Sequence, residues 1–278
     1  MKRIILSTLF LGITLFFSIK NVLAGPPLNN LEGAGGIAFN PLAYLADSDG
    51  EDSHAKIGNT DIIGKPRFGV WYVNLDHANV DWTAVGVADT LFKRLEVSYG
   101  YETVNQDGQL AKHKNNVGGK LLILPENSFD TKFLPALSVG TIYKTTSRVG
   151  AGVHDDGEDY YVVATKLLTF LPRPVLISGG ALSSQGKVTG VFGFDHQRKT
   201  TGFGNIDVIL PWNLIAGFEY KQGPRYNDWK DANYWDAHVA WTATKNLTLV
   251  AAYVNAGDPK GARVGLGDGL VLSAQYAF

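Results

Sequence analysis

Residues 270–278 read Leu-Val-Leu-Ser-Ala-Gln-Tyr-Ala-Phe, and this alternation predicts a β-strand with two different faces. Successive side chains of a strand point to opposite sides, so every second residue shares a face. One face is apolar along its whole length: Leu270, Leu272, Ala274, Tyr276 and Phe278. The other face carries Ser273 and Gln275 between small residues. Such a strand suits a sheet that separates an apolar medium from a polar one.

The same pattern repeats along most of the chain, with Gly, Pro and Asn between the repeats. Residues 95–102, for example, place Leu, Val, Tyr and Tyr on one face and Glu, Ser, Gly and Glu on the other. The pattern predicts twelve strands, at 67–75, 80–88, 94–104, 112–124, 133–144, 160–170, 174–182, 202–210, 213–221, 233–243, 246–255 and 268–278. A long series of two-faced strands fits either a soluble sandwich or a membrane barrel.

Loop lengths and aromatic residues favour the barrel. The connections 89–93, 171–173, 211–212 and 244–245 are short, whereas 105–111, 145–159, 183–201, 222–232 and 256–267 are longer. Two connections break this alternation, 76–79 on the long side and 125–132 on the short side. Transmembrane barrels have short periplasmic turns and long outer loops. With Phe278 at the periplasmic end, the aromatic side chains gather near two rims, the outer rim with Tyr101, Tyr143, Tyr220, Trp235 and Tyr253 and the inner rim with Trp241, Tyr276 and Phe278. Aromatic rings prefer the two bilayer interfaces, because each combines an apolar ring with a polar edge or tip.

The fold class expected is therefore all-β, a transmembrane antiparallel up-and-down barrel of about twelve strands over residues 67–278. Residues 25–66 do not continue the pattern. They are rich in Gly and Pro and carry an apolar patch at 37–45 followed by acidic residues at 47–52. A free periplasmic tail is one reading, but such a patch gains nothing from exposure to water. We expect a plug-like segment, tucked into the barrel or pairing with its first strand.

The first 24 residues have the features of a signal peptide. Met1-Lys2-Arg3 is positively charged, an apolar stretch follows, and Val22-Leu23-Ala24 resembles a cleavage site. The chain has no Cys, which excludes disulfides, thiol catalysis and cysteine zinc sites, and its net charge of −1 gives no attraction to nucleic acid. Export by a cleaved signal peptide to the cell outer membrane is the expected route.

Several motifs resemble a known family. The C-terminal Tyr276-Ala277-Phe278 resembles the signal that the barrel-insertion machinery reads in bacterial outer-membrane proteins. Most of the mature chain resembles a family of outer-membrane β-barrels catalogued as domain of unknown function 3034, on these stretches: 31–36 with Pro41, 92–98, 159–161 with 164–166, 217–221, 236–241 and 249–254. The resemblance implies a barrel in the outer membrane and supplies no catalytic residues.

Charged residues on the predicted lumen face are the candidate pore-lining set, namely Glu96, Glu102, Lys114, Lys120, Lys144, Lys166, Asp207, Glu219, Lys221, Asp236 and His238. They fit a polar channel or, equally, a salt-bridged interior that only satisfies its own charges. Asp236 and His238 share a face, but residues two apart on a strand are usually too distant to bond. No catalytic, metal or cofactor site is predicted, and the acidic stretch 154–159 is expected to be a solvated loop.

Three functions remain open at this point. The charged lumen favours a pore or facilitator for small polar or amphiphilic solutes. The balance of the lumen charges favours a structural or assembly component, for instance in surface-polymer export. A lipid hydrolase is the weakest hypothesis, because no nucleophile arrangement is recognisable. Expected partners are outer-membrane lipid, the insertion machinery, and lipopolysaccharide phosphates near the loop cations Arg198, Lys199, Arg225, Lys230, Lys260 and Arg263.

Overall fold

The computed structural model describes residues 28–46, 55–57 and 60–278. The predicted signal peptide, residues 1–24, lies outside the described residues. No helix among the described residues is long and apolar enough to cross a membrane.

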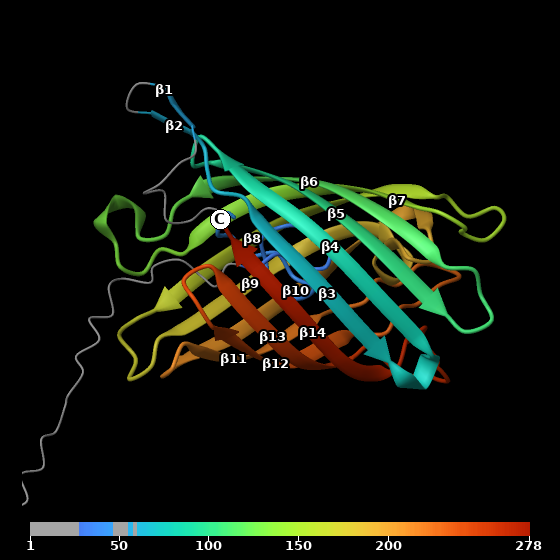
Figure 1. The fold of residues 1–278 in the computed structure, drawn as a ribbon. Coiled ribbons are helices and arrows are strands. Elements are labelled where there is room, and N and C mark those ends of the chain that lie inside the picture. The colour runs from blue at the N-terminus through green and yellow to red at the C-terminus, as the bar shows by residue number, and fades with distance from the viewer. Residues whose placement is uncertain (1–27, 47–54, 58–59) are drawn as a thin grey trace, which may run out of the picture.

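Strands β3 to β14 form one closed antiparallel barrel (Figure 1). Each strand pairs with the next in sequence, and β14 pairs with β3 from Ala277↔Arg67 to Gly269↔Leu75, which closes the ring. Their bounds are β3 Arg67–Leu75, β4 Val80–Leu91, β5 Leu95–Gln106, β6 Lys112–Leu124, β7 Ala136–Thr146, β8 Asp156–Leu168, β9 Val175–Gly186, β10 Phe194–Leu210, β11 Leu214–Lys221, β12 Tyr234–Thr242, β13 Leu247–Asn255 and β14 Asp268–Ala277. The predicted all-β barrel of twelve strands is confirmed.

A short hairpin lies outside this ring. Its strands, β1 (Ala55–Ile57) and β2 (Thr60–Ile63), pair with each other, and β2 touches β4 through Ile63↔Leu91. Figure 1 shows the hairpin at the end of the barrel that carries the C-terminus. The short connections 171–173, 211–212 and 244–245 lie at this end, so we call it the inner end and the opposite end the outer end.

Three strands extend further at the outer end than the sequence predicts. β8 begins at Asp156, β9 continues to Gly186, and β10 begins at Phe194 rather than residue 202. The register of β9 and β10 shifts between Phe194 and Lys199, so the alternation is interrupted there. The remaining residues of these strands carry polar side chains on both faces, so they do not alternate between apolar and polar. They lie beyond the part of the barrel whose outer surface is apolar. Arg198 and Lys199 are therefore strand residues and not loop residues.

The outside of the barrel is apolar and the inside is polar, which is the reverse of a soluble protein. Outward-facing side chains such as Val85, Val117 and Leu272 are 40–57% exposed. Inward-facing Glu102, Lys144 and Glu219 are fully buried. An apolar exterior of this extent is stable when hydrocarbon surrounds it and would aggregate in water.

The eight aromatic residues expected at the rims all lie on the outward face, between half-buried and exposed. The structure adds a further set that the strand pattern did not reveal, because its members lie in or beside the inner-end turns. These side chains are at least 59% exposed: Phe92, Phe129, Phe133, Phe170 and Trp212. Together with Trp241 and Phe278 they surround the inner end with aromatic rings, as a membrane interface favours.

A charged residue placed on the outward face tests whether that face contacts lipid. Val239 lies mid-strand in β12 with 48% of its surface exposed, so Val239→Arg should lower the free energy of unfolding by roughly 2–4 kcal/mol. Denaturant titrations in lipid vesicles measure this cost. The matched variant Asn105→Arg places the same charge outward near the outer rim, where the cost should be about 0–1 kcal/mol. Equal costs at the two positions would contradict the assigned membrane depth.

Candidate functional site

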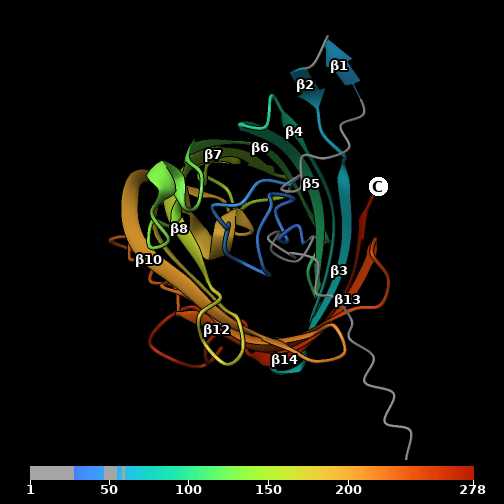
Figure 2. The same cartoon turned by 90° about the vertical axis from the view of Figure 1, so that its left-hand side faces the viewer.

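The lumen of the barrel is occupied by residues 28–46. Figure 2 looks along the barrel from the inner end and shows this segment, in blue, inside the ring of strands. All of its residues are buried except Phe39 and Tyr44, which are partly buried. We call residues 28–46 the plug. The first part of the predicted plug-like segment 25–66 is thus inside the barrel, whereas its last part forms the hairpin β1–β2, which pairs with β4 at Ile63.

The plug folds into two tight turns without forming a strand. Asn30 N–H donates to Ala34 O at 2.8 Å, and Ile37 N–H donates to Asn40 O at 3.0 Å. Leu31 N–H donates to Ala38 O at 3.0 Å and so ties the first turn to the second. Backbone groups that the turns leave unpaired need partners elsewhere, because a buried peptide group without a hydrogen bond is costly.

Glycines allow the first turn to lie directly on the barrel wall. Gly33 has φ +89°, and a Cβ there would lie 2.5 Å from Tyr99 O. Opposite it, a Cβ on Gly100 would lie 2.4 Å from Glu32 O. Any larger residue at either position would push the plug away from the wall. This close approach brings Glu32 to the lysines of the lumen.

Glu32 anchors the first turn to two lysines on neighbouring strands. Its carboxylate accepts from Lys114 Nζ at 2.9 Å and also from Lys144 Nζ. Each lysine has a second carboxylate partner on the wall, Glu102 at 2.9 Å for Lys114 and Asp159 at 2.6 Å for Lys144. The charges therefore form a chain that links β5, β6, β7 and β8 through the plug, with each ammonium between two carboxylates.

A second ion pair, nearer the inner end, holds the middle and end of the plug. Lys120 Nζ pairs with Glu96 at 2.9 Å and donates to Gly35 O at 3.0 Å and Tyr44 O at 2.7 Å. Glu96 in turn accepts from Gly35 N–H at 2.8 Å. The pair thus supplies both the donor and the acceptor that the peptide backbone of the plug lacks.

Glu219 holds the backbone of the second turn. Its carboxylate accepts three successive backbone N–H groups, from Ala38 at 3.2 Å, Phe39 at 2.9 Å and Asn40 at 2.8 Å. Glu219 is fully buried on β11. A carboxylate that accepts several backbone N–H groups forms strong, charge-assisted hydrogen bonds.

His238 bridges two aspartates, contrary to the expectation from strand spacing. Its Nδ1 lies 2.7 Å from Asp236 Oδ1, and its Nε2 lies 2.7 Å from Asp207 Oδ1. The reason is Gly217, which pairs with both His238 and Asp207 across β11. Without a side chain at Gly217, the imidazole can lean over the strand between them, since a Cβ there would lie 2.5 Å from His238 Nε2.

Loops close the outer end above the plug. Val188 and Val191 of the β9–β10 connection are buried, together with Tyr226 and Leu266 from the two longest outer loops. Asp231 ties the β9–β10 connection to the loop that carries Tyr226, because it accepts from Val188 N–H at 2.7 Å. It also accepts from the Trp229 indole of its own loop. Burial raises the pKa of the Asp231 carboxyl to about 6, although both hydrogen bonds act in the opposite direction.

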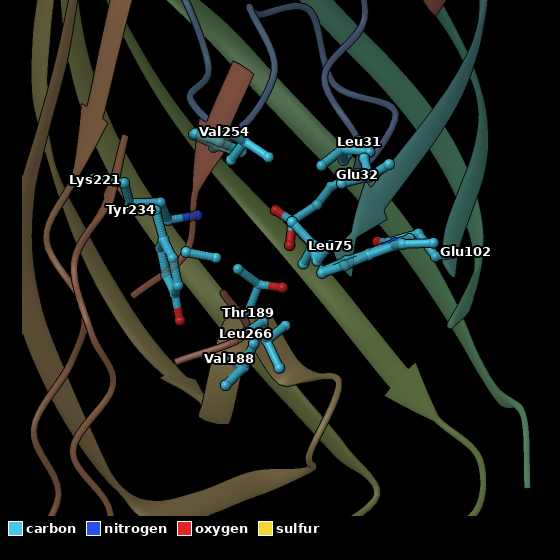
Figure 3. A pocket seen from close by; sticks show the side chains of 14 residues that line it. Leu31, Glu32, Leu75, Glu102, Val188, Thr189, Lys221, Tyr234, Val254 and Leu266 are labelled. Carbon is cyan, nitrogen blue, oxygen red and sulfur yellow. The ribbon is translucent and has the colours of Figure 1, made fainter. Parts of the chain in front are cut away.

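A cavity of about 50 Å³ lies between the plug and these loops. Figure 3 shows Lys221 and Glu32 extending into it from opposite walls. Most of the lining is apolar and comes from the plug, the barrel and the loops: Leu31, Phe39, Val73, Leu75, Trp82, Val188, Val254, Ala256 and Leu266. The remaining lining residues are Glu32, Glu102, Thr189, Lys221 and Tyr234.

The arrangement offers ion pairs and hydrogen bonds but no recognisable catalytic group. Both nitrogens of His238 are held by carboxylates, so neither can accept a proton from a hydroxyl nucleophile in this arrangement. The described part of the chain contains no group of three or more His, Asp or Glu placed to hold a metal ion.

Comparison with known proteins agrees with this architecture. The family model described as "Protein of unknown function (DUF3034)" matches residues 25–275. The chain belongs to this family. No protein with a curated description matches it in sequence.

Among solved structures, the chain resembles the NanC porin at 14% identity and a TM-score of 0.52, over 76% of this chain and 98% of the porin. It also matches Omp33 of Acinetobacter baumannii, at 12% identity and a TM-score of 0.46, over 78% and 98% of the two chains. The COG4313 outer membrane channel of Pseudomonas putida F1 gives 12% identity and a TM-score of 0.43, over 81% and 99%. The likeness to the NanC porin shows that this family member has the fold of an outer-membrane barrel.

Ten of the eleven candidate pore-lining residues lie on the lumen face of this DUF3034 barrel: Glu96, Glu102, Lys114, Lys120, Lys144, Asp207, Glu219, Lys221, Asp236 and His238. Lys166 is different. The inward residues of β8 are Val163, Thr165 and Leu167, so Lys166 points outward, where it pairs with Glu126 at 3.0 Å. The prediction that Lys166 faces the lumen is wrong, because the inward and outward faces of β8 were interchanged in the prediction.

Two central residues were missed by the strand pattern. Asp159 was assigned to a solvated acidic loop but lies in β8, where it is buried against Lys144. Extending the alternation of Tyr161 and Val163 backwards would have placed it inward. Glu32 lies in a segment without periodicity, so no pattern in the sequence indicated its role as the anchor of the plug.

Proposed function

We propose that the chain is an outer-membrane pore for small polar or amphiphilic solutes, and that the plug closes it until it moves. After removal of residues 1–24, the barrel would insert through its C-terminal strand with the aid of the insertion machinery. Its apolar exterior would contact outer-membrane lipid, and its outer cations would lie near lipopolysaccharide phosphates.

The observation that carries this proposal is the polar nature of the contact between plug and wall. Glu96, Lys120 and Glu219 hold the plug through its backbone groups, and these same side chains would line the lumen once the plug left. Water can replace such hydrogen bonds at a limited net cost, because each hydrogen bond to a charged group contributes only about 1.5–3 kcal/mol to folding. A passage opened in this way would have a wall of mixed charge, as selective pores have.

A structural or assembly role is the second candidate, and the filled lumen favours it. Every ammonium of the chain Glu102–Lys114–Glu32–Lys144–Asp159 has two carboxylate partners. Such a network also fits an interior that stays closed and only rigidifies the barrel. The two functions differ in whether the plug ever leaves the lumen.

A reversible cross-link separates them. Ala43 N–H donates to Thr165 Oγ1 at 2.8 Å, so the plug and β8 are adjacent there, and the chain contains no native Cys. The variant Ala43→Cys/Thr165→Cys should show single-channel openings in planar bilayers when reduced. Oxidation should abolish them, because the disulfide ties the plug to the wall.

Two controls complete the experiment. Each single-cysteine variant should open equally under both conditions, and a thiol assay confirms that the disulfide forms. Openings that persist in the oxidised double variant would show that the plug is not the gate. A complete absence of openings in the wild type and in the reduced variants would contradict the pore and leave the structural role.

A further inference from the structure

We propose that the cavity at the outer end binds a short aliphatic monocarboxylate, with Lys221 and Thr189 holding the carboxylate and the apolar wall holding the chain. Occupancy of this site can be measured whether or not the barrel opens.

Lys221 is the first observation. It extends from the end of β11 into the cavity and is 6% exposed. Among the described residues, none lies within hydrogen-bond or ion-pair distance of its ammonium, although the three other lysines of the lumen, Lys114, Lys120 and Lys144, each have at least one carboxylate partner. A buried ammonium is costly without an acceptor, so the site favours an anion next to it.

Thr189 is the second observation, and it is independent of the first. Its hydroxyl is buried and has no hydrogen-bond partner among the residues that the structure describes, yet it lines the same cavity. Thr189 also has φ +56°, a conformation that β-branched residues rarely adopt. An ammonium and a hydroxyl facing one cavity supply two donors, as the two oxygens of a carboxylate require.

The apolar part of the lining favours an aliphatic chain in the part of the ligand beyond its carboxylate. Leu75, Trp82 and Leu266 form part of an apolar wall that would contact an aliphatic chain. Glu32 also faces the cavity, but its carboxylate already accepts hydrogen bonds from both Lys114 and Lys144, so it is not free to bind a cationic ligand. The chemistry therefore points to one negative charge attached to an apolar body.

The size of the cavity limits that body. A volume of about 50 Å³ of this kind holds roughly four water-sized groups, at about 10–15 Å³ for each. Bonded atoms lie closer together than water molecules do, so a four-carbon acid such as butyrate is of suitable size. Longer chains would require the outer loops to move.

Isothermal titration calorimetry on the full-length protein in detergent micelles tests the proposal with three four-carbon probes: butyrate, butan-1-ol and butylamine. Butyrate should give saturable binding, butan-1-ol weaker binding and butylamine none. Lys221→Met should weaken butyrate binding roughly tenfold or more, because a charge-assisted hydrogen bond is lost. Thr189→Val should weaken it several-fold.

Controls keep a folding defect from being read as a binding result. Lys221→Met should still bind butan-1-ol as the wild type does, which shows that the cavity persists. Lys245→Met, in an exposed turn at the inner end, should bind butyrate unchanged. The proposal is wrong if butyrate binding never saturates, which would mean that water alone fills the site, if butylamine binds instead, or if Lys221→Met leaves butyrate binding intact.

Discussion

Replacing Lys144 with methionine should lower the free energy of unfolding by roughly 3–5 kcal/mol, because the change leaves a buried carboxylate without its cation. Lys144 is fully buried between Asp159 and Glu32, and Asp159 has no other lysine partner in the described structure. Glu32 would keep Lys114 at 2.9 Å. Denaturant titrations in lipid vesicles, monitored by heat-modifiable mobility, measure the loss.

The double variant Lys144→Met/Asp159→Leu is the matched control. It removes both members of the pair and fills the space with apolar atoms, so most of the lost stability should return. Equal destabilisation of the single and double variants would mean that Lys144 acts through its packing alone. The ion-pair chain described for the lumen would then have little energetic importance.

Replacing Glu219 with leucine should increase the open probability of the pore roughly a hundredfold. Three backbone N–H groups of the plug, at residues 38–40, lose their acceptor together. Each buried N–H without a partner costs about 1–3 kcal/mol, so a plug that stayed in place would be destabilised by about 3 kcal/mol or more. Release into water avoids this cost and shifts the population towards the open state.

Single-channel recording of Glu219→Leu in planar bilayers measures this effect. Glu219→Gln retains one acceptor oxygen in a side chain of similar shape, so its open probability should lie between those of the wild type and the leucine variant. An open probability that is the same in all three proteins would show that the second turn of the plug takes no part in gating.

The barrel could be predicted from the sequence because its physical cause is local. Alternation in stretches such as Leu95–Glu102 reports which side of each strand faces lipid, and every predicted strand is present. The strand prediction was less accurate where apolar and polar residues do not alternate. Around residues 195–201 both faces are polar, and β10 was therefore predicted to begin eight residues too late, at 202 rather than 194.

The contents of the lumen could be predicted only in part. Alternation placed ten charged residues inward, but it could not pair them, because pairing depends on strand register and on glycines such as Gly217. The bond between His238 and Asp207, which lie on two different strands, was missed for this reason. The position of the plug depends on single long-range contacts, such as the one between Glu32 and Lys144, which leave no periodic signal in the sequence.

Amide hydrogen exchange of the plug in the wild-type protein tests the central claim most directly, namely that residues 28–46 lie inside the closed barrel. The N–H groups of Gly35, Ala38, Phe39, Asn40 and Ala43 each donate to a wall side chain. In lipid vesicles they should exchange far more slowly than a free peptide, with protection approaching that of the strands. Exchange at the rate of an unstructured peptide at all five positions would place the segment outside the lumen and contradict the account.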